Sequence, residues 1–598
     1  MRTLLITAVS LGLLEHAGAQ VTERVSVATG GAQANFGADL PSPPGAVVSA
    51  DGRCVAFTSP ATNLVPGDSN GTWDVFVRDR LSATTERVSV DSNGLEGNGF
   101  SGGYGIAISP DGRYVAFDSQ ATNLIPGGTN GARNIFLRDR QTGTTKLVSI
   151  AIGGAQADGN CFHVAMTPDG RYVAFESVAT NLVPGDTNGQ DDLFIRDFSS
   201  GTTERVSVDS AGMQSDRGSY HLSVSANGRY VAFDSDATNL VPGDTNHRID
   251  VFVRDRQSGL TTRVSVDSSG TQAVGDSDAP SISSDGRYVA FSSDAGNLVA
   301  GDTNGCYDVF VHDRRDGTTE RVSVATGGMQ GNGLSYLAFM SADARFVAFS
   351  SGSTNFVSGA GVGQAYLRDR KNGTTEVVSV ATNGSFANNL GDSVCVTAGG
   401  RYVVFRSAAT NLVAGDTNAN GDVFIHDRFA TGFTNMCDPG AGGVIACPCS
   451  NPPGGSGQGC DNSAATGGAI LSASGIAYLS IDRLVFATSG EPPTAFSIVM
   501  QGNALVAHGV VYGQGVRCAG GATKRLFVKS AVAGGILAPD FTAGDPTVSA
   551  RSAANGDVIQ PGQSRWYLVY YRDPVVLGGC SATSTFNATQ TGQVTWWP

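Results

Sequence analysis

The sequence predicts an all-β protein: a seven-bladed β-propeller closed by its N-terminal strand, followed by a small disulfide-containing β-sandwich-like domain. Three observations predict this fold. Alternating runs such as RYVAF and DVFVRDR recur, whereas apolar patterns with a helical period are nearly absent. Three phrases of the type DGRYVAF, DVFVRDR and TTERVSV each occur seven times along the chain. The first copy of the third phrase has no repeat in front of it, and the seventh unit lacks that phrase.

Residues 1–19 have the pattern of a secretory signal peptide. A short basic start at Arg2 precedes an apolar stretch, and Ala17-Gly18-Ala19 fits the small-residue cleavage pattern. We therefore expect a secreted, periplasmic or cell-surface protein. No later apolar run is long enough to span a membrane, and the net charge of −14 argues against a nucleic-acid partner.

Each repeat of about 58 residues predicts four antiparallel strands. In the second repeat, 105–109 is the first strand, and the Asp-Gly pair in Pro110-Asp111-Gly112 predicts a tight hairpin turn. RYVAFDS returns as the second strand. A long loop leads to NIFLRDR, the third strand, and a short turn leads to TKLVSI, the fourth. Four such strands make one propeller blade.

The N-terminal phrase predicts how the ring closes. The seventh unit has DVFIHDR, starting at Asp422, but no fourth strand after it. The missing strand is the one left over at the N-terminus, so Val25-Ser26-Val27 is expected to pair with 422–428. This pairing would leave neither end of the ring with an exposed strand edge. The propeller is then expected to cover residues 20–435.

These phrases, SPDGRYVAF above all, resemble the WD40-like (PD40) repeats of TolB-type β-propellers. The long form ATNLVPGDTNG–DVFVRDR–TTERVSV looks especially like secreted bacterial repeat proteins. The resemblance covers roughly 20–435 and implies the propeller fold, whereas such propellers serve both as binding platforms and as accessory domains of peptidases. A separate N-terminal domain like that of TolB is not expected in this chain.

The unequal loop lengths predict which face of the propeller binds a ligand. The connections between first and second strands and between third and fourth strands are short turns. The loops between second and third strands and the links between blades are long, and both emerge on one face, where binding usually resides. We call it the long-loop face. The first hypothesis is a non-catalytic exported binding or scaffold protein that holds a protein or glycan ligand there.

An Asp-x-Asn-x-x-x-Asp pattern recurs in the long loops and could bind Ca²⁺. Hard cations take several oxygen ligands, and alternate side chains of a tight loop can converge on one ion. Blade seven offers the most side-chain oxygens. The alternative is that these residues only form turns through their own backbone. The candidate ligands are Asp68, Asn70, Asp74, Asp186, Asn188, Asp192, Asp244, Asn246, Asp250, Asp302, Asn304, Asp308, Asp416, Asn418, Asn420 and Asp422.

Blades two and six lack this acid pair but keep the aspartate of the RDR phrase. Blade two has Gly128 and Asn134 at the loop positions, yet retains Asp139; blade six has a rewritten loop, yet retains Asp369. The RDR aspartate is therefore predicted to have a structural role, which is to accept hydrogen bonds from backbone amides of the following turn.

The alternative function is a propeller enzyme, such as a lyase or hydrolase acting on extracellular glycans. The G-x-S-x-G match at residues 99–103 lacks the strand-turn-helix context of a nucleophile motif, so chance explains it better. His163 and His221 begin first strands and could approach the central channel. His312 and His426 stand where other blades have Arg. Convergence of His, Arg and acidic side chains at one channel mouth would favour an enzyme, and a sevenfold-similar neutral lining would favour binding.

The C-terminal part of the chain has a different composition. Residues 436–466 are rich in Cys, Gly and Pro and are expected to form a linker, and the apolar runs of 467–598 predict a compact β-sandwich-like domain. Six cysteines in an exported segment favour three disulfides, with zinc as the alternative. They are Cys437, Cys447, Cys449, Cys460, Cys518 and Cys580. The propeller's own cysteines, expected to be unpaired, are Cys54, Cys161, Cys306 and Cys395.

Overall fold

The computed structural model shows two compact units, 20–428 and 429–598. It describes residues 20–38, 45–418, 420–428 and 433–596, except 438, 442, 456, 475–476, 478, 480–481, 483, 561–562 and 576–584. The expected signal peptide and Cys580 lie outside the described residues. The second unit includes the Cys-rich stretch 436–466 that the sequence separates as a linker. Among the described residues, no helix is both long and apolar enough to span a membrane.

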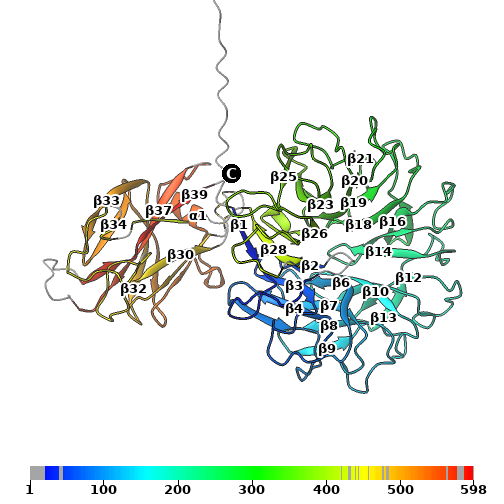
Figure 1. Cartoon of the computed structure of the whole chain (residues 1–598), viewed down its shortest axis with the longest axis horizontal. Helices are drawn as coiled ribbons and strands as arrows, with labels where there is room; N and C mark the ends of the chain where they lie inside the picture. The colour runs from blue at the N-terminus through cyan, green and yellow to red at the C-terminus, as the bar shows by residue number, and fades with distance from the viewer. Residues whose placement is uncertain are drawn as a thin grey trace, which may run out of the picture. The chain divides into compact units, whose positions relative to one another are not determined.

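The first unit is a ring of seven four-stranded antiparallel sheets, as predicted (Figure 1). Blades one to six run from their innermost to their outermost strand in chain order, whereas blade seven takes its outermost strand from the N-terminus. Blade one comprises β2 (Ala46–Val48), β3 (Cys54–Ser59), β4 (Asp74–Asp79) and β5 (Thr84–Arg87). Blade two comprises β6 (Ser101–Ile108), β7 (Tyr114–Ser119), β8 (Asn134–Asp139) and β9 (Thr144–Leu147). Blade three comprises β10 (Cys161–Met166), β11 (Tyr172–Ser177), β12 (Asp192–Asp197) and β13 (Thr202–Arg205).

The remaining four blades repeat this arrangement. Blade four comprises β14 (Ser219–Val224), β15 (Tyr230–Ser235), β16 (Asp250–Asp255) and β17 (Leu260–Arg263). Blade five comprises β18 (Ser277–Ile282), β19 (Tyr288–Ser293), β20 (Asp308–Asp313) and β21 (Thr318–Arg321). Blade six comprises β22 (Ser335–Met340), β23 (Phe346–Ser351), β24 (Gln364–Asp369) and β25 (Thr374–Val377). Blade seven comprises β26 (Gly391–Val396), a 3-10 turn (Ala398–Gly400), β27 (Tyr402–Ser407), β28 (Asp422–Asp427) and the N-terminal β1 (Val21–Arg24).

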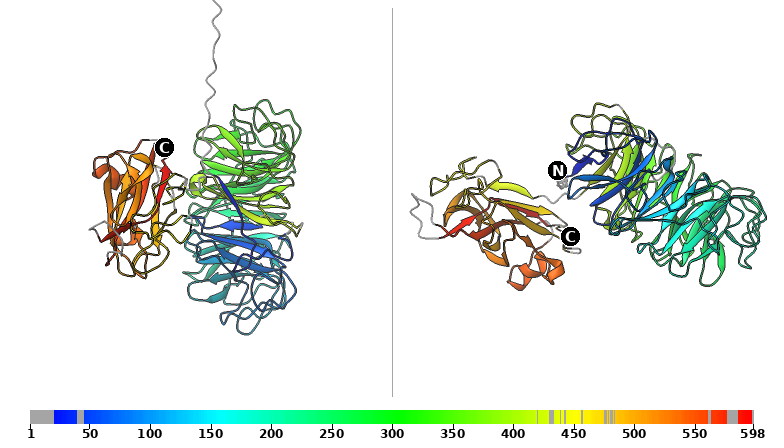
Figure 2. Two further views of the ribbon diagram at one scale, coloured as in Figure 1. Left: turned by 60° about the vertical axis from the view of Figure 1, so that its left-hand side comes forward. Right: turned by 90° about the horizontal axis from the view of Figure 1, so that it is seen from below.

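The N-terminal strand closes the ring, which confirms the predicted closure. β1 pairs antiparallel with β28, with Arg24 opposite Phe424. The blue start of the propeller therefore lies beside its yellow-green end (Figures 1 and 2). The paired residues are earlier than expected: the ladder uses VTER, and of the predicted Val25–Val27 segment, Val25 extends it by donating to the carbonyl of Val423 at 2.8 Å.

The outer strand of each blade is likewise shorter than the phrase that predicted it. In blade two it ends at Leu147, and the following residues turn back so that Ile150 bridges Gln156. Equivalent bridges occur in every blade, from Val27–Gln33 in blade seven to Val380–Phe386 in blade six. The VSV part of the phrase therefore starts the inter-blade link instead of extending the strand.

The core of each blade is built from apolar residues on the two central strands. In blade one, Phe57 of β3 lies opposite Phe76 of β4, and the two buried rings stack at 5.8 Å between centroids. The same stacked pair recurs in the other blades, with Tyr366 as one member in blade six. Aromatic pairs of this kind add to the free energy of burial.

The DGR turn joins neighbouring blades. Gly228 has φ +69°, and a Cβ atom there would lie 2.5 Å from the Tyr172 ring of the preceding blade. Glycine is therefore required both by the backbone and by the packing. Arg256 places its guanidinium 4.7 Å from the centroid of the same ring and donates from Nε to Glu204 at 2.5 Å. The contact ties blade four to blade three.

The RDR aspartate has the structural role that the sequence predicts. Asp79 accepts hydrogen bonds from the amides of Leu81 and Ser82, at 3.0 and 3.2 Å. It also pairs with Arg53 of the DGR phrase, whose Nη2 lies 2.6 Å from Oδ2. This hydrogen bond from Arg53 lowers the pKa of Asp79 to about 2. The arginine partner was not anticipated from the sequence.

The second unit is a β domain with three sheets. One sheet has the order β29-β39-β37-β32-β35, with β38 on β37; a second is β30-β31-β36, and a third is the hairpin β33-β34. Its strands are β29 (Thr434–Cys437), β30 (Ile470–Ser474), β31 (Val485–Ser489), β32 (Phe496–Gly502), β33 (Ala504–Tyr512), β34 (Gly515–Gly520), β35 (Lys524–Ser530), β36 (Leu537–Ala538), β37 (Ser564–Arg572), β38 (Phe586–Ala588) and β39 (Thr591–Thr595). It also contains a 3-10 turn (Phe541–Ala543) and α1 (Val548–Ala554).

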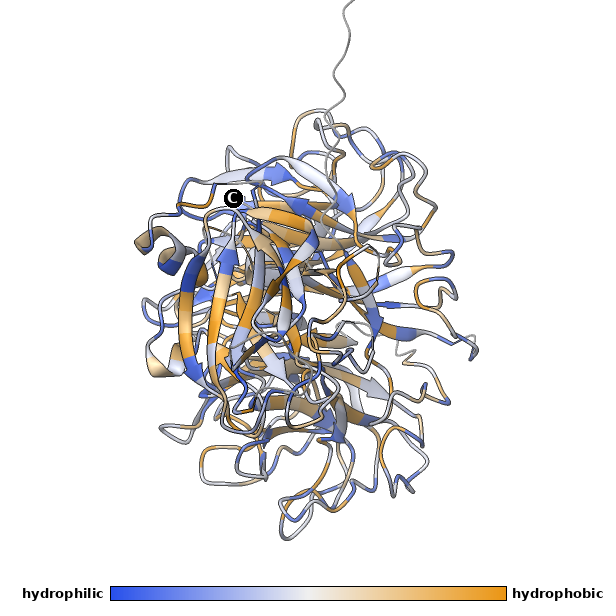
Figure 3. Ribbon diagram, turned by 90° about the vertical axis from the view of Figure 1, so that its left-hand side faces the viewer, coloured by the Kyte–Doolittle hydropathy of each residue, from blue (hydrophilic) through white to orange (hydrophobic). Residues whose placement is uncertain are grey.

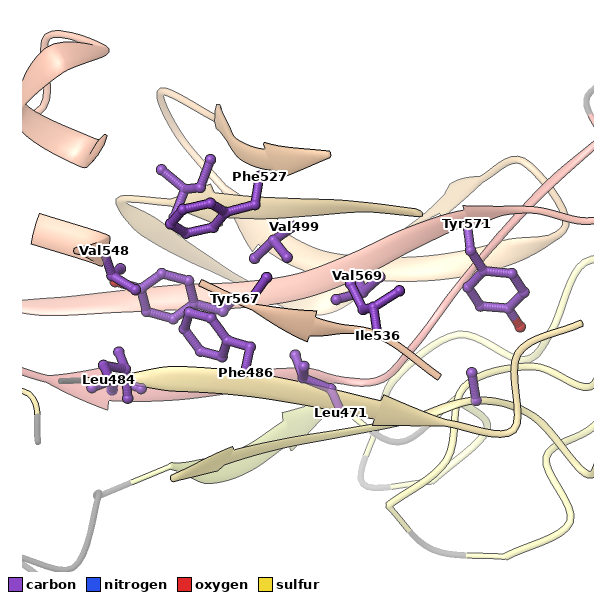
Figure 4. Packing of buried hydrophobic residues seen from close by; sticks show 14 of the residues in the cluster. Leu471, Leu484, Phe486, Val499, Phe527, Ile536, Val548, Tyr567, Val569 and Tyr571 are labelled. Carbon is purple, nitrogen blue, oxygen red and sulfur yellow. The ribbon is translucent and has the colours of Figure 1, made fainter. Parts of the chain in front are cut away.

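The core of this unit lies between the two larger sheets, which makes it sandwich-like. Phe486 of β31 contacts Tyr567 of β37, with ring centroids 4.5 Å apart (Figure 4). Trp596 is fully buried and donates from Nε1 to the Tyr567 hydroxyl at 3.0 Å. The strands carry long hydrophobic stretches, drawn in orange, beside hydrophilic ones, drawn in blue (Figure 3).

Disulfides hold the Cys-rich stretch onto this domain. Cys437 is bonded to Cys518 and Cys447 to Cys460, and Cys449 is disulfide-bonded as well. The four propeller cysteines (Cys54, Cys161, Cys306 and Cys395) are free, as predicted. Disulfides of this kind are typical of proteins that fold in an oxidising compartment.

Candidate functional site at the channel mouth

The Asp-x-Asn loops are brought together with arginines of the outer strands. In blade three, Nη1 of Arg205 lies 2.9 Å from Asp192 and 3.4 Å from Asp186, and the side chains of both aspartates are almost fully buried. Arg87, Arg263, Arg321 and Arg24 contact the aspartate pairs of blades one, four, five and seven in the same way. A guanidinium is thus a cation beside each of these aspartate pairs, which was not anticipated from the sequence.

The predicted asparagines have roles in these loops too. Asn70, Asn188, Asn246 and Asn304 each donate from Nδ2 to the second aspartate of their own loop, at 2.9 to 3.1 Å. In blade seven, Asn418 donates instead to the Ala34 carbonyl, and its Oδ1 accepts from the amide of Asn420. These bonds are turn and link contacts. Calcium binding by these loops stays a prediction. An ion bound there would have to share the aspartate oxygens with the arginine of the same blade.

Blades two and six show that the acids and the arginine occur together. At the arginine position, blade two has Leu147 and blade six has Val377. At the second acid position, these blades have Asn134 and Gln364, whose oxygens still accept from a serine hydroxyl at 2.7 and 2.6 Å. Within this chain, the charged residues are either all present or all absent.

Blade one has one acid more than the other blades. Glu96 stands where the others have Gln or Phe, and with Asp68 and Asp74 it forms a group whose ligand atoms lie within 4.8 Å of one another. Arg87 contacts all three carboxylates, at 2.6 to 3.3 Å. Burial, with the neighbouring Asp74, raises the pKa of Asp68 to about 6.

The inner strands of all seven blades line a cavity of about 800 Å³ in the central channel. Below its mouth the lining is apolar, with residues such as Ile106, Val164 and Met340. The starts of the inner strands lie at the long-loop face, because the long inter-blade links lead into them. Polar residues at these starts line the cavity in several blades, and four of them come from consecutive blades two to five: Tyr104, His163, His221 and Asp278. We call this group the mouth cluster.

Each histidine of the mouth cluster is held by a carboxylate of the neighbouring strand. Nδ1 of His163 lies 2.8 Å from Glu176, and Nδ1 of His221 lies 3.0 Å from Asp234. Both acids are buried. Although burial alone would lower it, the carboxylate of Asp234 raises the pKa of His221 to about 9.

The backbone at both histidines is distorted into the channel. His163 has φ +32° and His221 φ +24°, and the strand pairing shifts at each of them. A β-bulge of this kind re-aims a side chain. Ala279, Leu337 and Ser393 have the same positive φ in blades five to seven. The bulge is therefore common to these blades, and in blades three and four a histidine occupies it.

Charged groups surround the histidines on one side of the mouth. Burial and the neighbouring Asp234 raise the pKa of Asp278 to about 7, and burial and Glu176 raise that of Asp191 to about 6. Arg133 of blade two contacts Asp118 and lies 4.8 Å over the Tyr104 ring. The cavity lining is mostly apolar but holds His163, His221 and Asp278, with the other acids and Arg133 behind them, so it meets only in part the condition that favours an enzyme.

The serine of the G-x-S-x-G match and the histidine that replaces an arginine in blade five both make contacts within the scaffold. Ser101 of the G-x-S-x-G match is buried, and its hydroxyl lies 2.8 Å from that of Ser119. His312 contacts the Thr319 hydroxyl at 2.9 Å, as Arg78 contacts Thr85 at 3.2 Å in blade one. These contacts agree with substitution within a structural strand.

No family model and no curated protein matches the sequence. Among solved structures it is similar to TolB from Acinetobacter baumannii, at 14% identity over 55% of this chain and 64% of that chain, with a TM-score of 0.32. It is also similar to the β-propeller domain of the Trilobed protease from Pyrococcus furiosus, at 13% identity over 64% and 95% of the two chains, TM-score 0.38. Dipeptidyl peptidase 4 from Porphyromonas gingivalis matches at 14% identity over 60% and 50%, TM-score 0.33.

These similarities are too low to carry an argument about activity, and the match spans less than two thirds of the Acinetobacter baumannii TolB. The fold is established by the chain's own sheets. Seven consecutive four-stranded sheets, with the outer strand of the last one supplied by β1, form a seven-bladed β-propeller.

Proposed function

We propose that this protein is an exported binding protein that takes a neutral glycan segment into the channel mouth. The observation that carries the proposal is the cavity of about 800 Å³, apolar in depth and polar on one side of its mouth. Cavities with mostly apolar walls and a few convergent polar groups are the usual form of a ligand site. The disulfides of the second unit support export.

The chemistry of the lining favours an uncharged sugar over an anionic one. Tyr104, Tyr307 and Tyr336 border the cavity, and such rings offer an apolar face together with a hydroxyl. Asp278, which lines the cavity, provides acceptors for sugar hydroxyl groups. Four carboxylates gather around the two histidines, so a polyanionic glycan would be repelled in the absence of a bound cation.

Binding can be tested on the mature chain, residues 20–598, with an array of neutral and acidic glycans and with peptides. We expect a neutral oligosaccharide to bind, and Tyr104→Ala with Tyr336→Ala to weaken its affinity at least tenfold. Tyr512→Ala, in the other unit, is the matched control. Selective binding of peptides, or an affinity that the double tyrosine variant leaves unchanged, would contradict the proposal.

Glycan hydrolysis is the second candidate, and the mouth cluster favours it. Two imidazoles, each oriented by a buried carboxylate, could transfer protons at a bound sugar. The bound oligosaccharide should then be cut, with the cut abolished in His163→Ala. Recovery of intact oligosaccharide after prolonged incubation would leave binding as the function. An unsaturated sugar product would identify a lyase instead.

A further inference from the structure

The two histidines of the mouth cluster are arranged as a pair. They come from the innermost strands of adjacent blades, β10 and β14, and their ring centroids lie 4.7 Å apart at an interplanar angle of 58°. Because Nδ1 of each ring is held by a carboxylate, Nε2 is left for another partner. Among the described residues, neither Nε2 has a hydrogen-bond partner. Two nitrogen donors therefore lie close together with no protein partner assigned to them.

The carboxylates behind the rings are of the type found behind metal-binding histidines. Histidine ligands almost always give their second nitrogen to a carboxylate or carbonyl, which fixes the tautomer and the ring orientation. Glu176 and Asp234 do this here, at 2.8 and 3.0 Å. Asp234 is 1% exposed, and its Oδ1 has no hydrogen-bond partner although it is buried. A buried carboxylate oxygen without a hydrogen-bond partner is a position that a water or an ion can satisfy.

The spacing of the rings fits one ion between them. With metal–nitrogen bonds of about 2.0–2.1 Å, each ring centroid would lie about 3.2 Å from the ion. Two centroids 4.7 Å apart then subtend an angle of roughly 95° at the ion, which is within the range of four- to six-coordinate sites. Imidazole nitrogen selects zinc and neighbouring first-row metals over calcium or magnesium.

A candidate third ligand lies in the next blade, although in this structure its carboxylate and the two imidazole rings do not offer ligand atoms that all lie within 4.8 Å of one another. Asp278 of β18 lines the cavity in the next blade, and its charge acts on His221. The Ala279 amide beside it donates to Asp234 Oδ2 at 3.0 Å, so this strand is tied to the carboxylate that holds His221. A rotation of the Asp278 side chain toward the imidazoles would add one oxygen, and the positions left over would be open to water or to a sugar hydroxyl.

We propose that the channel mouth binds one divalent transition-metal ion, of which Zn²⁺ is the type, through Nε2 of His163, Nε2 of His221 and the carboxylate of Asp278. This site shares its cavity with the proposed glycan site, but metal binding is measured without any glycan. The ion would lower the net negative charge of the mouth and offer an open coordination position to a ligand hydroxyl.

The test is a metal titration of the whole mature protein after treatment with a chelator. We expect one Zn²⁺ per chain by calorimetry, and a cobalt-substituted protein with a visible absorption band of nitrogen and oxygen ligation. His163→Ala and His221→Ala should each lower the affinity at least a hundredfold. Glu176→Gln should lower it ten- to a hundredfold, since the ligands remain and only their orientation is lost.

His247→Ala is the matched control, because His247 is an exposed histidine in a long loop of the same blade as His221. It should leave affinity and stoichiometry unchanged. Circular dichroism and melting temperature establish that each variant is folded, and Asp278→Asn provides a further variant that retains both imidazoles. No Zn²⁺ binding at micromolar protein, or equal binding in wild type and the double histidine variant, would overturn the proposal. Neither result would decide whether a glycan binds.

Discussion

Replacing Arg205 by leucine tests whether the buried arginine is the counter-ion of the long-loop aspartates. In the wild type, Arg205 lies 2.9 Å from Asp192 and 3.4 Å from Asp186, whose side chains are 0% and 3% exposed. The variant Arg205→Leu leaves both carboxylates buried without their cation. Removing one partner of a buried ion pair costs about 3–5 kcal/mol, because the remaining charge is uncompensated. We expect the free energy of unfolding of the propeller to fall by that amount.

The chain itself supplies the control. Blade two has Gly128, Asn134 and Leu147 at the corresponding positions, and its Asn134 keeps the hydrogen bond from Ser149 at 2.7 Å. The triple variant Asp186→Gly, Asp192→Asn, Arg205→Leu copies this neutral set into blade three. Replacing a whole buried charged group by neutral residues is often neutral in stability. We therefore expect the triple variant to regain most of the stability that Arg205→Leu loses, although it carries two more substitutions.

Urea denaturation followed by tryptophan fluorescence and by circular dichroism measures both variants, with the slope compared to detect loss of two-state behaviour. An Arg205→Leu protein as stable as the wild type would refute the counter-ion role. So would a triple variant no more stable than the single one, because the cost would then come from lost packing of the arginine stem.

Three further predictions address the closure, the RDR aspartates and calcium. Deleting residues 20–31 removes β1 and leaves Asp416 and Asp422 without Arg24, so the melting temperature should fall markedly; an unchanged melting curve would be inconsistent with ring closure. Arg53 holds the pKa of Asp79 at about 2, below the value of about 3.9 in the unfolded chain. The ionised carboxylate therefore stabilises the folded state above about pH 4, and this contribution is lost as the pH falls toward 2. Asp79→Asn should thus show a shallower loss of stability in acid than the wild type, and parallel curves would argue against the pairing. If the loops bind calcium, millimolar calcium should raise the melting temperature of the EDTA-treated protein, with the tightest site in blade seven. Asp416→Ala should then remove that site. If calcium titration gives no calorimetric heat and no change in melting temperature, the aspartates serve only as partners of arginine.

The ring was predictable because its phrases repeat, and each repeat fixes the same strands. The count of seven and the strand supplied by the N-terminus both follow from the positions of these phrases. The boundaries of the strands were less predictable than their number. In blade two the outer strand ends at Leu147, and in the other blades at the equivalent position, because the next residues turn into the inter-blade link. The phrase TTERVSV contains no glycine or proline that would mark this end.

The arginine of the long-loop pair was present in the same phrase but was not recognised. The role of this arginine could have been recognised by comparing the repeats, because Leu147 and Val377 replace it in the two blades that have lost the acids. The partner of Asp79 was missed for a similar reason. Arg53 lies far from Asp79 in the sequence, and only the pairing of β3 with β4 places Cys54 opposite Asp79 and so brings Arg53 to it.

The mouth cluster was predicted in part. The approach of His163 and His221 to the channel followed from their place at the start of the first strands. The acids beside them were missed because they do not neighbour the histidines in the sequence. Glu176 and Asp234 stand at the end of the second strand, where the register places Phe162 opposite Glu176 and Tyr220 opposite Asp234. Pairing each first strand with the end of its second strand would have found them.

The contrast between repeated and unrepeated positions separates the scaffold from the site. Positions that carry the same residue in blade after blade, such as the DGR arginine and the RDR aspartate, pair with each other and hold the blade. The register at the end of the second strand behaves differently: in blades one to seven it holds Thr58, Asp118, Glu176, Asp234, Ser292, Ser350 and Arg406. Five different residue types at seven equivalent positions cannot all meet one structural need of the ring. The side chains that contact the histidines come from this variable register, and for that reason the mouth of the channel is where the chemistry of this protein should be sought.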